Sequence, residues 1–295
     1  MRTYPELSDW HLHSHFSSDS TETPENIIKN AINMQLKSIC FTEHNDYDYP
    51  LEDGNVVFAL DYDKYTDELL ELKERYKNDI FIGIGVEQGL LSSAKDKINN
   101  YDPTGRLDFI IGSSHLVYGN DPYYPEFWDN VSVKDAISRY YEAITDCIKT
   151  CDNFDVYGHL DYIVRYAPDQ DNDYNWKDYY DYFDTILRLL IDKGKGIEIN
   201  TAGLKYGLKN PNPCLDIVKM YRSLGGEIIT TGSDAHKACH IAYSYEIITD
   251  MLKNTGFNYY TIFKERKPEF VSIAHKGYHH QLFCRLIAPY MFINI

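Results

Sequence analysis

The sequence predicts an α/β protein, built as one barrel of parallel strands with surrounding helices. Three observations predict this fold class. Short apolar runs alternate with longer amphipathic segments, and we count seven such β/α units with no linker to divide them. The run at 80–86 is apolar almost throughout, as in parallel strands buried on both faces. In addition, a His, Glu or Asp follows strand after strand, and in parallel barrels those strand ends converge on one rim.

The expected elements follow the chain in order. After an opening strand around His11, Thr23 fits the N-cap of a helix with Pro24 at its first position. Further helices are expected at 65–76, 132–150, 179–193 and 214–224. The remaining strands are expected at 38–42, 80–86, 108–114, 154–158, 196–200 and 227–231. Two long acidic and aromatic loops, 45–61 and 119–130, are expected to cover a site at the strand ends.

His11 and His13 predict a metal site. Alternate side chains of an extended strand share a face, so both imidazoles should point the same way. Imidazole nitrogens suit Zn, Mn or Fe, but two ligands leave such an ion under-coordinated. The other strand ends offer further ligands, namely Glu43, His44, Glu87, His115, His159, Asp234 and His236. The sequence therefore predicts a metal centre assembled from several strands.

The composition of the chain excludes some classes of binding partner. The formal charge of -16, without a clustered basic face, argues against binding to nucleic acid. No apolar run follows Met1, and the apolar stretch at 282–295 is interrupted by Arg285 and Pro289 and is too short to span a bilayer. We therefore expect a soluble, cytoplasmic protein that makes no membrane contact. The six cysteines have no regular spacing, which favours free thiols.

Short motifs stand at the strand ends. They are His-x-His at 11–13, Thr-Glu-His at 42–44, Gly-x-Glu at 85–87, Ser-x-His at 113–115, Gly-His-Leu-Asp at 158–161 and Gly-Ser-Asp-Ala-His at 232–236. Together they resemble the polymerase and histidinol phosphatase (PHP) superfamily, and the segments 158–166 and 198–204 resemble its histidinol-phosphatase branch. The resemblance implies a distorted (β/α)7 barrel over residues 1–273 with a metal site at the C-terminal ends of the strands. Residues 274–295 remain as an extension of unknown role.

The resemblance also implies ligands for two to three divalent metal ions (Zn, Mn or Fe). His11, His13 and Asp234 would hold one ion, and Glu87 would bridge it to a second ion held by His115 and His159. Asp19, His44 and His236 would hold the third. His15 competes with Asp19 for this place, and we favour Asp19 because the segment 16–20 fits the branch. Glu43, on the alternate face, is expected to orient an imidazole.

Such a site implies a metal-dependent phosphomonoesterase. Paired divalent ions turn a bridging water into hydroxide near neutral pH and neutralise phosphate oxygens. In this hypothesis a metal-bridging hydroxide attacks phosphorus, while Arg165 holds the phosphate through two parallel hydrogen bonds. Asp234 or His236 would relay a proton to the leaving alkoxide, and inorganic phosphate would be a product.

The branch implies L-histidinol phosphate, a metabolite of histidine biosynthesis, as the small-molecule substrate. Loop residues are candidates to receive its amine and imidazole, namely Asp46, Tyr47, Asp48, Tyr118 and Asp121. Two segments depart from the branch, Tyr118-Gly119 and 237–240, and they leave a changed specificity open.

Two alternatives also stay open. One is a PHP-type phosphoesterase that acts on another small phosphate or a nucleotide, although the acidic composition disfavours a nuclease. The other is a non-catalytic metal-binding protein, against which the full ligand set with Arg165 argues. In the tail, His275, His279 and His280 favour an exposed extension or a dimer contact. The sequence leaves the native metal and the oligomeric state open, a homo-oligomer included.

Overall fold

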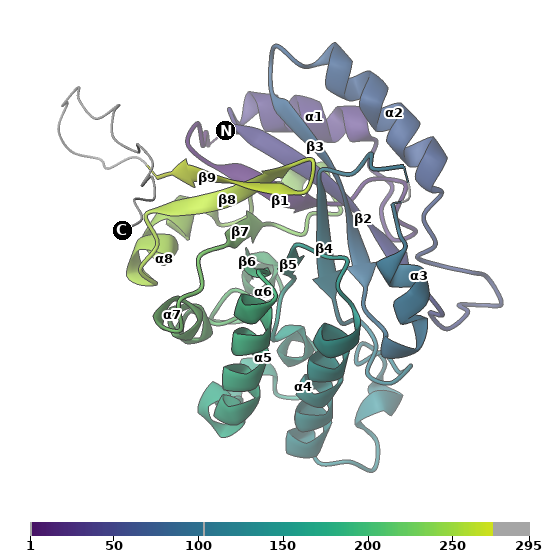
Figure 1. Cartoon of the computed structure of the whole chain (residues 1–295), viewed down its shortest axis with the longest axis vertical. Helices are drawn as coiled ribbons and strands as arrows, with labels where there is room; N and C mark the ends of the chain where they lie inside the picture. Colours follow the sequence, from purple (N-terminus) through teal and green to yellow (C-terminus); the bar gives the residue numbers. More distant parts are fainter. Residues whose placement is uncertain (1, 103, 274–295) are drawn as a thin grey trace, which may run out of the picture.

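Seven parallel strands form the centre of the structure (Figure 1), a computed structural model that describes residues 2–102 and 104–273. Each strand pairs with the next one along the chain, so the order in the sheet is the order in the sequence. The strands are β1 (Ser8–Leu12), β2 (Ser38–Asp46), β3 (Phe81–Gly89), β4 (Phe109–Ser113), β5 (Val156–Tyr157), β6 (Gly196–Asn200) and β7 (Ile229–Gly232). The prediction of a seven-stranded parallel barrel is confirmed.

The register between β2 and β3 places two charged residues side by side. These strands are buried along nearly their whole length, which explains their apolar sequences. They pair from Ser38 with Phe81 to Asp46 with Gly89, and His44 therefore lies beside Glu87. Backbone pairing alone thus brings two of the predicted ligands together.

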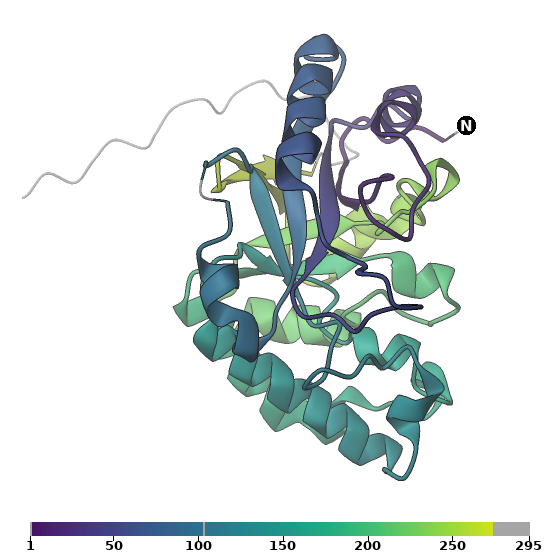
Figure 2. The ribbon, with the colours of Figure 1, turned by 90° about the vertical axis from the view of Figure 1, so that its right-hand side faces the viewer.

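Helices surround the strands (Figures 1 and 2). In Figure 1, α1 (Pro24–Asn33) and α2 (Tyr62–Arg75) lie above the strands, and α4 (Val133–Thr150) and α5 (Tyr180–Asp192) lie side by side below them. The other helices are α3 (Lys95–Asn99), α6 (Ala202–Lys205), α7 (Leu215–Ser223) and α8 (Ile248–Asn254). Thr23 caps α1 as expected, its side chain accepting from the N–H of Asn26. α2 begins earlier than predicted because Asp61 caps it.

The barrel closes through a short seam between β1 and β7. Leu12 and Ala235 form an isolated parallel bridge. Beside it, the N–H of Asp234 donates to the carbonyl of His11 at 2.9 Å, and the N–H of His13 donates to the carbonyl of Ala235 at 3.0 Å. The seam joins the first and last strand-end motifs of the chain.

An antiparallel hairpin, β8 (Tyr259–Lys264) and β9 (Lys267–Ser272), follows the barrel and was missing from the predicted elements. Its two turn residues, Glu265 and Arg266, have φ values of 48° and 64°, where such turns ordinarily use Asn-Gly. The barrel holds this turn. Arg266 Nε donates to Asp155 at 2.6 Å, and the N–H of Glu265 donates to Asp108 at 3.1 Å. Tertiary contacts therefore stabilise a turn that the local sequence does not signal.

Three sequence expectations concern the rest of the chain. Across the described ranges, none of the helices has both the length and the apolar character needed to cross a membrane. Cysteines 40, 147, 151, 214 and 239 are free thiols, as predicted. The tail at 274–295, with its three histidines and Cys284, lies outside the described residues.

We expect the Arg266→Ala substitution to destabilise the fold. It removes a guanidinium that contacts Asp155, a side chain only 9% exposed whose pKa is raised by burial. Because a buried carboxylate then loses its cation, the free energy of unfolding should fall by about 2 kcal/mol. The control Arg188→Ala removes an exposed helical ion pair with Asp184 and should leave the free energy of unfolding nearly unchanged. Urea unfolding measures both, and equal effects would contradict the prediction.

Candidate metal centre

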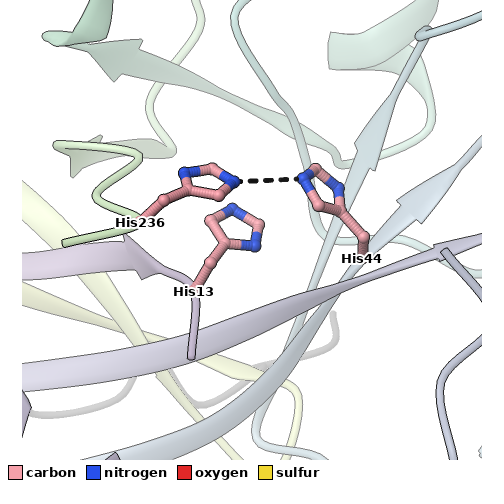
Figure 3. Close-up of side chains that lie close together, drawn as sticks. All are labelled: His13, His44 and His236. Carbon is pink, nitrogen blue, oxygen red and sulfur yellow. Dashed lines mark hydrogen bonds between the residues drawn. The ribbon is translucent and has the colours of Figure 1, made fainter. Parts of the chain in front are cut away.

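Three imidazoles from distant parts of the chain converge at the carboxyl end of the barrel (Figure 3). His13 follows β1, His44 lies on β2, and His236 follows β7. The ring of His13 stacks on those of His44 and His236, with centroids 4.2 Å and 4.1 Å away. The Nε2 atoms of His44 and His236 are 3.4 Å apart. The three rings therefore offer nitrogen atoms to one small volume, as a metal site requires.

The carboxylate of Glu87 lies at the centre of the larger cluster, fully buried. Its Oε2 atom is 3.1 Å from Nε2 of His11, 3.5 Å from Nε2 of His13 and 3.1 Å from Nδ1 of His44. Its Oε1 atom is 2.8 Å from Nε2 of His159 and 3.2 Å from Nε2 of His115. One carboxylate thus divides five imidazoles between its two oxygens.

Asp234 adds a second carboxylate from the β7 side. Its Oδ1 atom is 3.5 Å from Nε2 of His13 and 3.6 Å from Nδ1 of His236. Asp234 and His159 both have a left-handed backbone, with φ values of 52° and 22°. Residues other than glycine rarely adopt this conformation, and such strain gathers at functional sites.

Asp19 rather than His15 reaches the cluster. The Oδ2 atom of Asp19 is 3.0 Å from Nε2 of His236 and 3.6 Å from Nε2 of His44. His15 is exposed, and its ring stacks on Phe16. The structure therefore brings together all nine predicted side chains, namely His11, His13, Asp19, His44, Glu87, His115, His159, Asp234 and His236.

Asp46 contacts an imidazole, although the sequence had suggested a loop residue facing the substrate. It is the last residue of β2, and its Oδ1 atom is 2.8 Å from Nδ1 of His115. A Cβ at Gly89 would lie 2.0 Å from the same oxygen, so only glycine leaves room for this contact. Two-residue spacing from His44 on one strand was the signal in the sequence, since such residues share a face.

Glu43 acts on His13 through a serine. Its carboxylate accepts from the N–H and hydroxyl of Ser14, at 2.9 Å and 2.7 Å, and from the hydroxyl of Ser17 at 2.6 Å. Because the Ser17 hydroxyl donates to Glu43, its oxygen accepts from Nδ1 of His13 at 3.1 Å. This contact leaves Nε2 of His13 as the nitrogen that faces Asp234.

The cluster fits divalent metal ions. Buried atoms face its centre without a hydrogen-bond partner in the described part of the chain, namely Nε2 of His11, Nε2 of His13, Nδ1 of His44 and Oε2 of Glu87. Leaving such atoms unpaired costs about 1–3 kcal/mol each. Four groups of side chains in the described part of the chain offer ligand atoms within 4.8 Å of one another. They are His11 with His13 and Asp234, His11 with Glu87 and His159, His13 with His44 and His236, and His44 with Asp46 and His115. Imidazole and carboxylate ligands without thiolate suit Zn, Mn and Fe.

Mutual contact shifts the pKa values of these groups. Burial raises the pKa of Glu87, but His11 and His115 outweigh burial and hold it well below its usual range. Burial lowers the pKa of His115, but Asp46 and Glu87 outweigh it and raise the pKa to about 10. Burial and the nearby imidazoles hold the pKa of His13 well below its usual range. In the absence of a metal ion, the negative carboxylates therefore favour protonated forms of some of the imidazoles. A metal ion has to compete with those protons.

A cavity of about 360 Å³ opens onto the cluster, and its lining adds three cationic side chains to the carboxylates Asp19, Glu87 and Asp234. Its further lining residues are Tyr162, Arg165, Tyr166, Lys205, Tyr206, Lys237 and His240. The guanidinium of Arg165 is 7% exposed and lies against the rings of Tyr162 and Tyr206, 5.0 Å and 4.6 Å from their centroids. Its Nη2 atom forms an ion pair with Oδ2 of Asp234 at 3.6 Å, but neither Nε nor Nη2 has a hydrogen-bond partner in the described chain. A buried guanidinium with free N–H groups suits a phosphate.

Sequence reasoning missed part of this cavity. Lys205 and Tyr206 follow β6, and Lys205 Nζ donates to the carbonyl of Asp234 at 3.3 Å. They directly follow the segment 198–204, whose resemblance to the histidinol-phosphatase branch could have indicated that they lie near the site. The loop residues expected to receive a substrate amine, Tyr47, Asp48, Tyr118 and Asp121, do not line this cavity.

The fold and the site define a class of protein, a (β/α)7 barrel with a metal centre at the carboxyl ends of its strands. Comparison with known proteins agrees. Residues 9–202 match the model of the PHP domain family. A histidinol-phosphatase from Lactococcus lactis is 34% identical over 260 residues, which cover 88% of this chain and 95% of that protein. A probable histidinol-phosphatase from Thermotoga maritima is 32% identical over 257 residues, with 87% and 95% covered.

A solved structure is also similar. The crystal structure of histidinol phosphate phosphatase from Lactococcus lactis, complexed with Zn, L-histidinol and phosphate, matches with a TM-score of 0.81 at 32% sequence identity. The match covers 90% of this chain and 99% of that one. The chain therefore belongs to the PHP family, within its group of histidinol-phosphatase relatives.

We expect the Glu87→Gln substitution to abolish stabilisation by metal. Zn²⁺ added to metal-stripped wild-type protein should raise the thermal midpoint, because a ligand at 100 times its Kd stabilises the folded state by about 2.7 kcal/mol. In the variant an amide replaces the carboxylate, so two anionic oxygens no longer face the imidazoles on its two sides. Most of the Zn²⁺-induced rise in the thermal midpoint should therefore disappear. Scanning calorimetry measures it, and Glu227→Gln, at an exposed position, is the control. A full Zn²⁺-induced shift in the Glu87 variant would contradict the prediction.

Proposed function

We propose that this protein is a metal-dependent phosphomonoesterase that hydrolyses L-histidinol phosphate to L-histidinol and inorganic phosphate, a step of histidine biosynthesis. One observation carries the proposal. A buried carboxylate, Glu87, divides five imidazoles between its oxygens, and the same cavity contains the guanidinium of Arg165, whose Nε and Nη2 atoms have no hydrogen-bond partner in the described chain. The Lactococcus lactis structure, with Zn, L-histidinol and phosphate, supports this choice of substrate.

We assign the ligands of two to three divalent ions (Zn, Mn or Fe) as follows. His11, His13 and Asp234 would hold one ion, His115 and His159 would hold a second ion that shares Glu87 with the first, and Asp19, His44 and His236 would hold the third. The groups of side chains that converge within 4.8 Å support these sets in part. When bound, the ions would lower the pKa of water toward neutrality and neutralise negative charge on phosphate.

Arg165 and Lys205 bind the phosphate group in this proposal. The rings of Tyr162 and Tyr206 flank the guanidinium of Arg165, so little conformational entropy is lost when it pairs with phosphate oxygens. Lys205 contributes an ammonium group to the same cavity.

The leaving alkoxide of histidinol needs a proton. Asp234 and His236 line the cavity, and their side chains are 3.6 Å apart. We assign the proton relay to this pair, because a carboxylate next to an imidazole can hold a proton within reach of the leaving oxygen.

The direct test is phosphate release by metal-replete protein. We expect turnover of L-histidinol phosphate, with much lower rates on nucleotides and none on oligonucleotides, because the protein has a net charge of -16. The Glu87→Gln variant, assayed in parallel, should show no turnover. Absence of phosphate release from every phosphomonoester offered to the metal-replete wild type would refute the proposal.

Replacement of Arg165 should weaken transition-state binding without unfolding the protein. Arg165→Lys keeps the charge but loses the paired hydrogen bonds, so kcat/KM should fall by about 10- to 100-fold, equivalent to about 1.5–3 kcal/mol. Arg188→Lys, at an exposed helical position, should leave kcat/KM unchanged. Steady-state kinetics measures both variants. An unchanged kcat/KM for the Arg165 variant would contradict a role of this residue in binding phosphate.

A further inference from the structure

Glu198 is a buried carboxylate for which the metal assignments have no role. It lies on β6, a strand that contributes none of the proposed ligands, and it is 1% exposed. Its Oε1 atom is 2.7 Å from Nδ1 of His11. Its Oε2 atom accepts from the backbone N–H of His159 at 3.1 Å and from Nδ2 of Asn200 at 3.2 Å. The side chain therefore contacts the positions of two proposed ligands from two different strands.

The contact with His11 selects one tautomer of its imidazole. A carboxylate only accepts hydrogen bonds, so Nδ1 of His11 carries the proton that it donates to Glu198. The other nitrogen, Nε2, is then free to bind a metal, and it lies 3.1 Å from Glu87 and 3.9 Å from Asp234. A negative charge behind the ring also makes this nitrogen a stronger ligand.

The contact with His159 acts through the backbone. His159 has a φ value of 22°, which places its main chain in a sparsely populated conformation. The hydrogen bond from its N–H to Glu198 holds the chain in this conformation, from which the imidazole reaches Glu87 at 2.8 Å. Without this acceptor, the strained backbone would lose one of the contacts that maintain it.

Asn200 extends the network to Asp234. Its Nδ2 atom donates to Glu198 and lies 3.5 Å from Oδ2 of Asp234. Its Oδ1 atom accepts from the N–H of Ala202 at 2.9 Å, which fixes the orientation of the amide. Glu198 and Asn200 thus connect β6 to proposed ligands that lie on β1 and directly after β5 and β7.

Gly232 leaves the space that this arrangement needs. A Cβ at this position would lie 2.3 Å from Oε1 of Glu198 and 2.4 Å from Cβ of His11. Any other residue would push the two groups apart. The glycine of the motif Gly-Ser-Asp-Ala-His therefore has a packing role next to Glu198.

We propose that Glu198 is a positioning residue that fixes the tautomer of His11 and the backbone of His159, and thereby sets the metal affinity of the site. The inference rests on the proposed ligand set but not on the identity of the substrate.

The test is Zn²⁺ binding by metal-stripped Glu198→Gln protein, measured by competition with a chromophoric chelator. In one orientation the NH2 group of the glutamine would face Nδ1 of His11, and in the other it would face the N–H of His159 and Nδ2 of Asn200. In both cases one donor faces another donor. We therefore expect Zn²⁺ affinity to fall by about 10- to 100-fold. The matched control is Asp155→Asn, since Asp155 is also a buried carboxylate but pairs with Arg266 at the hairpin turn. It should lower the thermal midpoint and leave Zn²⁺ affinity unchanged.

A second variant keeps the inference testable if Glu198→Gln does not fold. Glu198→Asp keeps the charge but withdraws the carboxylate from His11, and it should lose Zn²⁺ affinity in the same range. Wild-type affinity in a folded Glu198 variant would overturn the inference. So would failure of both variants to fold while Asp155→Asn folds, because the role of Glu198 would then be structural. Zn²⁺ binding is measured without a phosphate ester, so a wrong substrate assignment would leave this result unaffected.

Discussion

The structure depends on the burial of one carboxylate, Glu87, among five imidazoles. A buried charge is stable only when opposite charges and hydrogen bonds compensate for the lost water. Here the compensation comes from rings that lie on β1 and β2 or directly after β1, β4 and β5, so no single element can build it. The barrel must therefore hold several strand ends in register for the centre to exist.

Two backbone features supply that register. Pairing of β2 with β3 sets His44 beside Glu87, and the short seam between β1 and β7 joins His11 to Asp234 and His13 to Ala235. Behind the rings, carboxylates and hydroxyls fix the nitrogen that faces inward, as Asp46 does for His115 and Ser17 does for His13. Strand pairing thus sets the backbone position of each imidazole, and these hydrogen bonds set the orientation of its ring.

The cavity above the cluster contains cationic side chains although the molecule as a whole is acidic. The chain has a net charge of -16, yet Arg165, Lys205 and Lys237 line this cavity together with the carboxylates of the cluster. Local cations in a concave site attract an anionic ligand even when the whole protein is acidic. Tyrosine rings against the guanidinium of Arg165 restrict its movement without neutralising it. This contrast is compatible with a small dianionic substrate and unfavourable for a polyanion.

The sequence by itself determined the parallel strands, most helix positions and the strand-end side chains, because apolar periodicity and capping residues act over a few neighbouring positions. It did not determine the contacts of Asp46 and Glu198, whose partners are far away in the chain. Nor did it determine the turn at Glu265 and Arg266, whose backbone conformation is held by Asp108 and Asp155. Only the tertiary structure decided these features, and the proximity of Asp19 rather than His15 to the cluster, because each depends on distances between separate segments that form when the barrel closes.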